Sequence, residues 1–391
     1  MKKTFGLGSL LLLIVAASLA EPPRPRLQII NGSDQAVAIF WLKPGGERIE
    51  QGTLPIGKDK VITTTLGHEF LLVGQRDHHE IKVTSALAVQ ACRYPEAVNF
   101  LPLPDDGQVV RPPAALAIPS FYTQYISAHG FPIVGSAKVD PHALKEAAFL
   151  ANQMLDHRLD VRNAMIRSGA RMCIIAHNEF TTDLPEFAHL TRPPGYEALS
   201  DKDYWDARAR GTGGSQTDPY CTSAEENLLG YPGDPYSQEC ILIHEFAHNI
   251  HLRGMANVDP TFDRRLKETY ENAMAQGLWR GKYPSVNHHE YFAEGVQSWF
   301  DDNRENDHDH NHVNTRAELL TYDPGLAAIC REVFGDTVIK YQKPATRLAG
   351  HMAGYDPAKA PTFTWPSRLQ KARDLIRQKV AERAQDATED Q

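Results

Sequence analysis

The segment ILIHEFAHNI at residues 241–250 decides how this chain is interpreted. It contains HEFAH at residues 244–248, a match to the H-E-x-x-H pattern of zinc hydrolases. On a helix, His244 and His248 lie one turn apart on the same face, so both imidazoles can reach a single ion. Glu245 is displaced around the helix and remains free to act as a general base on a water that the ion activates. Apolar neighbours form a stripe that would bury this helix in a core.

A zinc ion bound by two histidines still lacks one protein ligand of a catalytic site. His251 lies too far along the same helix to share the ion with both histidines. The metzincin pattern requires a glycine and then a histidine further on, but His251 and Gly254 occupy those places. That family is therefore excluded.

Glu290 is the better candidate, because it belongs to a second predicted helix at residues 287–301 and stands 42 residues after His248. Glu294 follows one turn later on the same face, so one carboxylate can bind zinc while the other accepts a hydrogen bond from a ligand histidine. The alternative is a solvated helix carrying two glutamates. The largely apolar neighbours argue against it, since carboxylates in such surroundings require partners.

The stretch YPSVNHHEYFAE at residues 283–294 resembles the active-site segment of the anthrax lethal factor family of zinc peptidases, which belong to the gluzincins. In that family a tyrosine precedes the glutamate ligand by seven residues, as Tyr283 precedes Glu290 here. The resemblance implies a zincin-like α+β domain, Zn²⁺ with Glu290 as third ligand, and Glu294 as hydrogen-bond partner of a ligand. It also implies that the Tyr283 hydroxyl points at the reacting centre, the alternative being an ordinary core tyrosine. It covers two short segments and implies no substrate preference.

A different pattern precedes this region. Short apolar runs separated by turn residues predict a small all-β sandwich over residues 27–90. The runs are Leu27–Ile30, Val37–Leu42, Val61–Thr65 and Phe70–Val73.

Residues Trp41 to Leu72 resemble, without gaps, the β domain of the von Hippel–Lindau tumour suppressor. The matching pieces are WL at 41–42, GE at 46–47, TLP at 53–55, Gly57 and GH at 67–68. The resemblance implies a β-sandwich with a peptide-binding surface, in which Trp41 and His68 are retained. A spacer or substrate-presenting module is favoured instead, because four positions of the family's ligand site differ. Gln51, Thr63, Thr64 and Phe70 stand where the family has Tyr, His, Ser and Trp.

The first twenty residues have the anatomy of a secretory signal peptide. Lys2 and Lys3 precede an apolar run at residues 10–17, and small residues end it. A secreted or periplasmic protein is expected, the alternative being an uncleaved anchor. The formal net charge of −8 becomes −10 once both lysines are removed. So acidic a chain excludes nucleic acid and anionic lipid as partners, and no later apolar stretch is long enough for stable membrane insertion.

The remaining segments complete the predicted organisation. It consists of a leader at 21–26, a proline-rich linker at 91–119, the zincin-like metallopeptidase domain at 120–345, and a C-terminal helix with a polar tail at 346–391. Inside the large domain we expect helices over 141–168, 236–253 and 287–301, a buried strand over 170–176, and an irregular region over 181–235 that borders a substrate cleft. A charged surface helix is expected over 366–384.

Three further features carry weaker expectations. The five cysteines leave at least one thiol unpaired, and Cys221 with Cys240 is the expected disulfide. The His- and Asp-rich run at residues 307–312 is interpreted as a solvated loop rather than a metal site. His288 or His289 is expected to line the cleft.

These patterns together predict a secreted zinc metallopeptidase that cleaves peptide or protein substrates, with Glu245 as general base. Two alternatives stay open: a peptide-binding or scaffold protein with a structural or decayed zinc site, and a zinc-dependent hydrolase of a non-peptide amide. Glu245 and Tyr283 argue against a structural or decayed site, since a purely structural ion requires neither residue.

Overall fold

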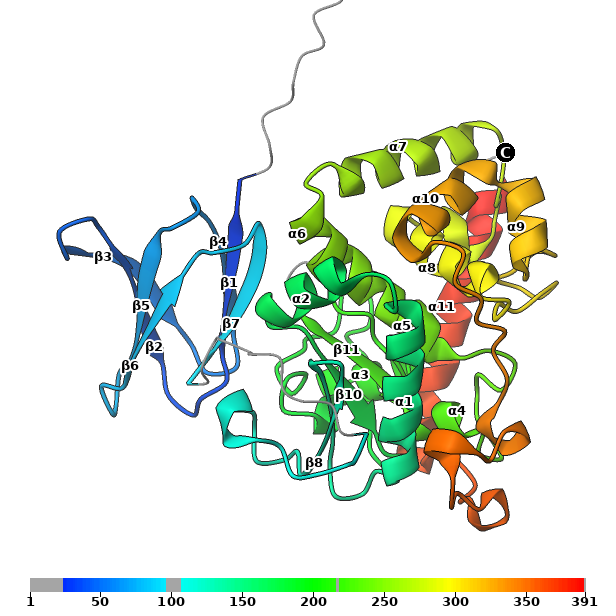
Figure 1. The fold of residues 1–391 in the computed structure, drawn as a ribbon, viewed down its shortest axis with the longest axis horizontal. Helices are drawn as coiled ribbons and strands as arrows, with labels where there is room; N and C mark the ends of the chain where they lie inside the picture. Colours follow the sequence, from blue (N-terminus) through cyan, green and yellow to red (C-terminus); the bar gives the residue numbers. More distant parts are fainter. Residues whose placement is uncertain (1–23, 96–106, 216–217, 390–391) are drawn as a thin grey trace, which may run out of the picture.

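The computed structural model describes residues 24–95, 107–215 and 218–389. The predicted signal peptide, most of the predicted leader and residues 96–106 of the predicted linker lie outside these ranges. An all-β part formed by residues 26–94 precedes a larger mixed α+β part, which confirms the predicted fold class (Figure 1). Within the described ranges, no helix combines the length and the apolar character that crossing a bilayer requires.

The all-β part consists of one three-stranded and one four-stranded sheet, in the orders β4-β1-β7 and β3-β2-β5-β6. Strand β1 pairs antiparallel with β4 and parallel with β7. The strands are β1 (Arg26–Asn31), β2 (Val37–Leu42), β3 (Arg48–Leu54), β4 (Asp59–Thr63), β5 (Glu69–Gly74), β6 (Glu80–Thr84) and β7 (Val89–Tyr94). The expected strands correspond to β1, β2, β4 and β5. β3 and β6 were not predicted, because charged, exposed residues interrupt their apolar pattern. β7 was not predicted either, and it extends the sandwich beyond residue 90 into the predicted linker.

Alternate positions of these strands face each other across the sandwich. Side chains two residues apart on a strand point to the same side, so pairs from β1, β2 and β5 build one core. The core includes Leu27 and Ile29, Val37 and Ile39, and Phe70 and Leu72. The sandwich is therefore held by ordinary apolar packing.

The α+β part is built on a four-stranded sheet of order β11-β10-β9-β8. Its strands are β8 (Gln124–Ala128), β9 (Phe131–Gly135), β10 (Arg171–Ile175) and β11 (Tyr220–Ala224). β8 runs antiparallel to β9, whereas β9, β10 and β11 are parallel. Every residue of β10 is buried, as expected for the predicted strand.

The helix predicted over residues 141–168 is two helices, α1 (Pro141–Met154) and α2 (Leu159–Arg167). The α1 start is as expected, because the Asp140 carboxylate accepts a 2.8 Å hydrogen bond from the His142 amide and Pro141 occupies the first turn. The region 181–235, predicted to be irregular, contains α3 (Asp201–Arg208), β11 and α4 (Glu225–Leu229). That prediction was wrong for these three elements.

Two helices carry the predicted ligands. The first, α5 (Ile241–Asn249), begins five residues later than expected and continues into a π-helix at Ile250–Met255. The second, α8 (His288–Trp299), begins where expected, since the Asn287 side chain caps it by accepting hydrogen bonds from the amides of His289 and Glu290. The other helices are α6 (Ala256–Val258), α7 (Phe262–Ala275), α9 (Arg316–Tyr322), α10 (Pro324–Phe334) and α11 (Gln370–Glu389).

The sandwich is anchored to the α+β part through β1 and β7. Ile30 and Ala91 join an apolar cluster with residues of the larger part such as Tyr122. The backbone of Val89 exchanges two hydrogen bonds with the Asn257 side chain, at 2.8 and 2.9 Å. Apolar packing and paired hydrogen bonds therefore both cross the boundary.

The expected disulfide between Cys221 and Cys240 is absent, because none of the five cysteines forms a disulfide, and all five are buried. The Cys221 thiol on β11 lies 3.8 Å from the carbonyl oxygen of Arg171 on β10. The Cys240 thiol, just before α5, lies against the Tyr341 hydroxyl instead. Burial raises the pKa of both thiols. The two side chains pack against different elements, which is why nearness in sequence misled the prediction.

Candidate metal centre

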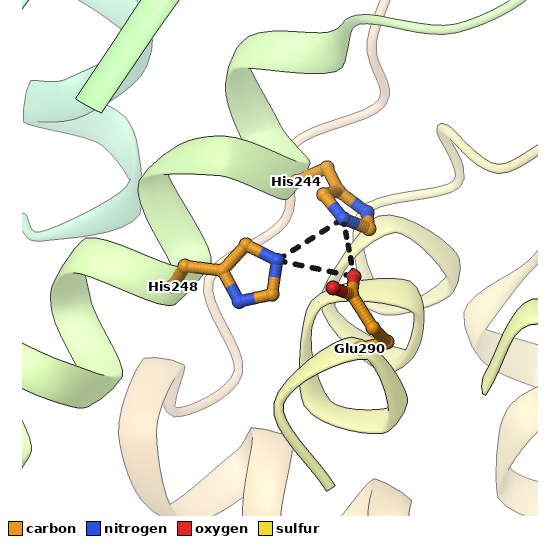
Figure 2. A group of neighbouring side chains, drawn as sticks. All are labelled: His244, His248 and Glu290. Atoms are coloured by element: carbon orange, nitrogen blue, oxygen red, sulfur yellow. Dashed lines mark hydrogen bonds and ion pairs between the residues drawn. The ribbon is translucent and has the colours of Figure 1, made fainter. Parts of the chain in front are cut away.

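The three predicted ligands converge on one point between α5 and α8 (Figure 2). Nε2 of His244 lies 3.2 Å from Nε2 of His248 and 3.1 Å from Oε2 of Glu290. Nε2 of His248 lies 3.3 Å from the same carboxylate oxygen. Both histidines are buried, and the Glu290 side chain is 20% exposed.

This triangle has the dimensions of a metal site. Ligand atoms about 2.0–2.2 Å from a tetrahedral zinc ion are separated from one another by roughly 3.3–3.5 Å. Two imidazoles and one carboxylate form the donor set of many catalytic zinc sites, which keep a fourth position open. Other first-row divalent ions accept the same donors. The residues present therefore fit a divalent transition-metal ion.

Contacts behind His244 hold its ring in the orientation that the site requires. Its Nδ1 lies 2.9 Å from Oε1 of Gln297 and 3.4 Å from Oε1 of Glu294. Acceptors at Nδ1 place the ring proton there and leave the lone pair of Nε2 toward the ligand triangle. Glu294 occupies the position that the sequence predicts. Gln297 was missed, although its place seven residues after Glu290 puts it on the same face of α8.

Glu294 continues into a buried hydrogen-bond chain that sequence reasoning missed. Its Oε2 lies 3.2 Å from Nε2 of His310, whose Nδ1 lies 2.7 Å from Oδ1 of Asp307. The prediction of a solvated loop over residues 307–312 was wrong for His310, which is only 4% exposed. The same loop accepts a 2.8 Å hydrogen bond from the Tyr283 amide through the Asp309 carbonyl. No spacing in the run distinguishes His310 from its exposed neighbour His308.

A cavity of about 590 Å³ opens over the ligand triangle. Glu245 and Tyr283 line it together with the three ligands, and the Tyr283 ring lies 6.1 Å from the His244 ring. Arg208, at the end of α3, reaches the Tyr283 hydroxyl. The sequence contained no signal for Arg208, because α3 lies in the region predicted to be irregular.

Burial and neighbouring charges set the protonation of these groups. Burial raises the pKa of Glu245, and the imidazoles of His244 and His248 offset only part of that rise. Burial also raises the pKa of Tyr283, with the Glu290 carboxylate adding to the effect, so its hydroxyl keeps its proton at neutral pH. Burial would raise the pKa of Glu290 too, but its bonds to the two imidazoles lower it, and this carboxyl is ionised.

The opposite wall of the cavity is a glycine-rich segment, GTGG at residues 211–214. A Cβ on Gly213 would lie 2.3 Å from Cδ2 of His248. A Cβ on Gly211 would lie 3.0 Å from Cγ of Glu245. The backbone at Gly213 therefore approaches α5 so closely that a side chain there would collide with His248, which the sequence did not predict.

His289 lines the cavity, in line with one of the two alternatives given for the histidine pair. In the sandwich, the rings of Trp41 and His68 lie 5.1 Å apart. Phe70 is buried in the sandwich core and Thr63 belongs to the other sheet. These two residues therefore do not extend the Trp41–His68 surface.

No protein-family model and no curated protein matches the chain. The fold and the site together define a protein with an N-terminal β-sandwich and an α+β part that holds a buried His-His-Glu candidate metal centre.

Proposed function

We propose that this protein is a zinc-dependent peptidase of the gluzincin type, exported by its N-terminal signal sequence. One observation carries the proposal: His244, His248 and Glu290 converge at the base of a cavity that also contains Glu245 and Tyr283. Zinc bound by these ligands supplies a Lewis acid that polarises a carbonyl group and lowers the pKa of water. A purely structural ion requires neither an open cavity nor those two additional side chains.

Glu245 is the proton carrier in this proposal. Its carboxylate lines the cavity next to both ligand histidines without belonging to the ligand triangle. It accepts the proton of the attacking water and delivers it to the leaving amine. Burial raises its pKa above the ordinary value, which suits a group that must both take up and release a proton.

Tyr283 and Arg208 are the proposed donors to the carbonyl oxygen of the scissile bond. The raised pKa of Tyr283 keeps its hydroxyl protonated, and Arg208 beside it adds a fixed positive charge. Negative charge develops on the carbonyl oxygen as water adds, so donors aimed at it lower the barrier. Comparable donors contribute about 10²–10³ in rate.

The shape of the cleft supports a peptide or protein as substrate. A second cavity of about 400 Å³ shares Trp205, Thr212 and Ser215 with the first and reaches Gln28 and Lys58 of the sandwich. The two cavities therefore adjoin each other along the glycine-rich segment. An extended peptide bound at the metal centre would run along this segment toward the sandwich.

The test is a digest of an unbiased peptide library by the zinc-loaded protein, comparing wild type with Glu245→Gln. We expect the variant to keep its zinc and to lose about 10²–10⁴ in rate, the usual contribution of a general base. Glu47→Gln, on an exposed sandwich hairpin, is the matched control and should leave the rate unchanged. Undiminished cleavage by Glu245→Gln would refute the assignment, and zinc binding without cleavage by wild type would favour a structural site.

A further inference from the structure

A second group of potential ligands lies beside the first. His251 from the π-helix, Asp263 from α7 and His289 from α8 each offer a ligand atom, and these atoms all lie within 4.8 Å of one another. Nδ1 of His251 is 3.5 Å from Nδ1 of His289, and Nε2 of His251 is 3.0 Å from Oδ1 of Asp263. None of these residues belongs to the His-His-Glu triangle.

The π-helix explains why the His251 side chain points in a different direction from the His248 side chain. A π-helix is wider than an α-helix and turns less per residue, so the residues after Asn249 point in new directions. The His251 side chain is fully buried and turned toward Asp263. Its ring makes edge contacts with Phe262 and Phe292 at 5.4 and 5.7 Å, which hold it in place. Short π-helical turns recur at functional sites.

The spacing of the three side chains is compatible with a shared cation. Nδ1 of His251 faces Nδ1 of His289 at 3.5 Å, about the 3.3–3.5 Å between two ligands of a tetrahedral ion, while Nε2 of His251 contacts Asp263. A single ion can use only one of these two His251 nitrogens, and one ligand atom from each of the three residues lies within 4.8 Å of the others. His288 binds the same Asp263 oxygen at 3.0 Å and thereby orients the carboxylate. A cation reaches the group easily, because the Asp263 side chain is 45% exposed and His289 lines the cavity.

We propose that His251, Asp263 and His289 form a second site for a divalent transition-metal ion, with two imidazole nitrogens and one carboxylate oxygen as protein ligands. Donors of this kind select Zn²⁺ and related first-row ions over Mg²⁺ or Ca²⁺. An ion here adds positive charge to the cavity wall at His289. The proposal does not depend on the peptidase activity proposed above.

The experiment counts Zn²⁺ bound to the full-length, metal-stripped protein by calorimetric titration and by elemental analysis after gel filtration. Wild type is expected to bind two equivalents, and Asp263→Asn, an isosteric change at a partly exposed position, one. His289→Gln should likewise lose one equivalent, which guards against misfolding of any single variant. His308→Gln, at an exposed histidine, is the control and should bind as wild type does.

Glu290→Gln separates the two sites. The second site is supported if Glu290→Gln still binds one equivalent of Zn²⁺ and Asp263→Asn has lost one equivalent, even if no peptide is cleaved. Unchanged stoichiometry in folded Asp263→Asn and His289→Gln, judged by circular dichroism, would overturn it and leave a hydrogen-bonded histidine cluster.

Discussion

The sandwich and the α+β part differ in whether they bury carboxylates and histidines. Among the described residues of the sandwich, no carboxylate or histidine is buried. The α+β part buries His244, His248 and His251 along one helical segment, and it also buries Glu294 and His310 on other segments. Burying a charged group is unfavourable unless a partner or an ion compensates. Burial of ionisable groups therefore points to the part of the molecule that carries the chemistry.

Substitutions in the two parts should also have different effects. Apolar packing in the sandwich is additive and local, so a change there should lower stability and little else. The metal centre joins α5 to α8 and to the glycine-rich segment, so a change there should affect metal affinity and activity together. The following predictions test this contrast.

The largest effect is expected from Glu290→Ala, which removes the carboxylate shared by both imidazoles. Loss of an outer partner of a metal ligand lowers affinity by about 10–100-fold, and loss of a ligand itself should exceed that range. Zinc affinity is measured by competition with a chelator. Glu271→Ala on an exposed face of α7 is the control and should not change it. Near wild-type affinity in Glu290→Ala would contradict the assigned ligand set.

Gly213→Ala should come next, because its methyl group collides with the His248 ring. We expect zinc affinity to fall at least about tenfold, as for other changes that displace a ligand. Gly211→Ala is the matched comparison, since its methyl group meets Glu245 instead. That variant should keep zinc and lose hydrolysis. Equal zinc affinities for both variants would show that the glycine-rich segment, rather than the His248 ring, moves to accommodate the added methyl group.

A smaller effect concerns acid stability without metal. Burial would raise the pKa of Glu294, but His244 and His310 lower it to about 2. A carboxyl with a depressed folded-state pKa contributes stability above its unfolded pKa, near 4.3, and loses it as the pH falls toward 2. That contribution is on the order of 1–3 kcal/mol. Denaturant unfolding of the metal-free protein between pH 5 and 2.5 should show a weaker pH dependence in Glu294→Gln, and an unchanged slope would contradict the prediction.

The smallest effect on the metal centre is expected from Trp41→Ala in the sandwich. The Trp41 ring packs partly against the sandwich core, so its loss should lower the free energy of unfolding by about 1–3 kcal/mol. Zinc affinity and peptide cleavage should stay within about twofold of wild type, because Trp41 is not among the residues that line the cavity. A tenfold loss of cleavage would mean that this surface takes part in substrate binding.

The sequence by itself determined the local parts of this protein. The one-turn spacing of His244 and His248 follows from helical periodicity, and so does the placement of Glu294 one turn beyond Glu290. Short apolar runs between turn residues likewise located β1, β2, β4 and β5. These features could be predicted because each depends only on residues a few positions apart.

Tertiary structure alone decided which distant segments meet. Gln297 and His310 reach the ligand histidine and its partner, Gly213 lies against His248, and the π-helix turns His251 toward Asp263. Each of these contacts joins elements whose approach depends on how the whole core packs. No local periodicity encodes that packing, so these residues became visible only in the folded chain.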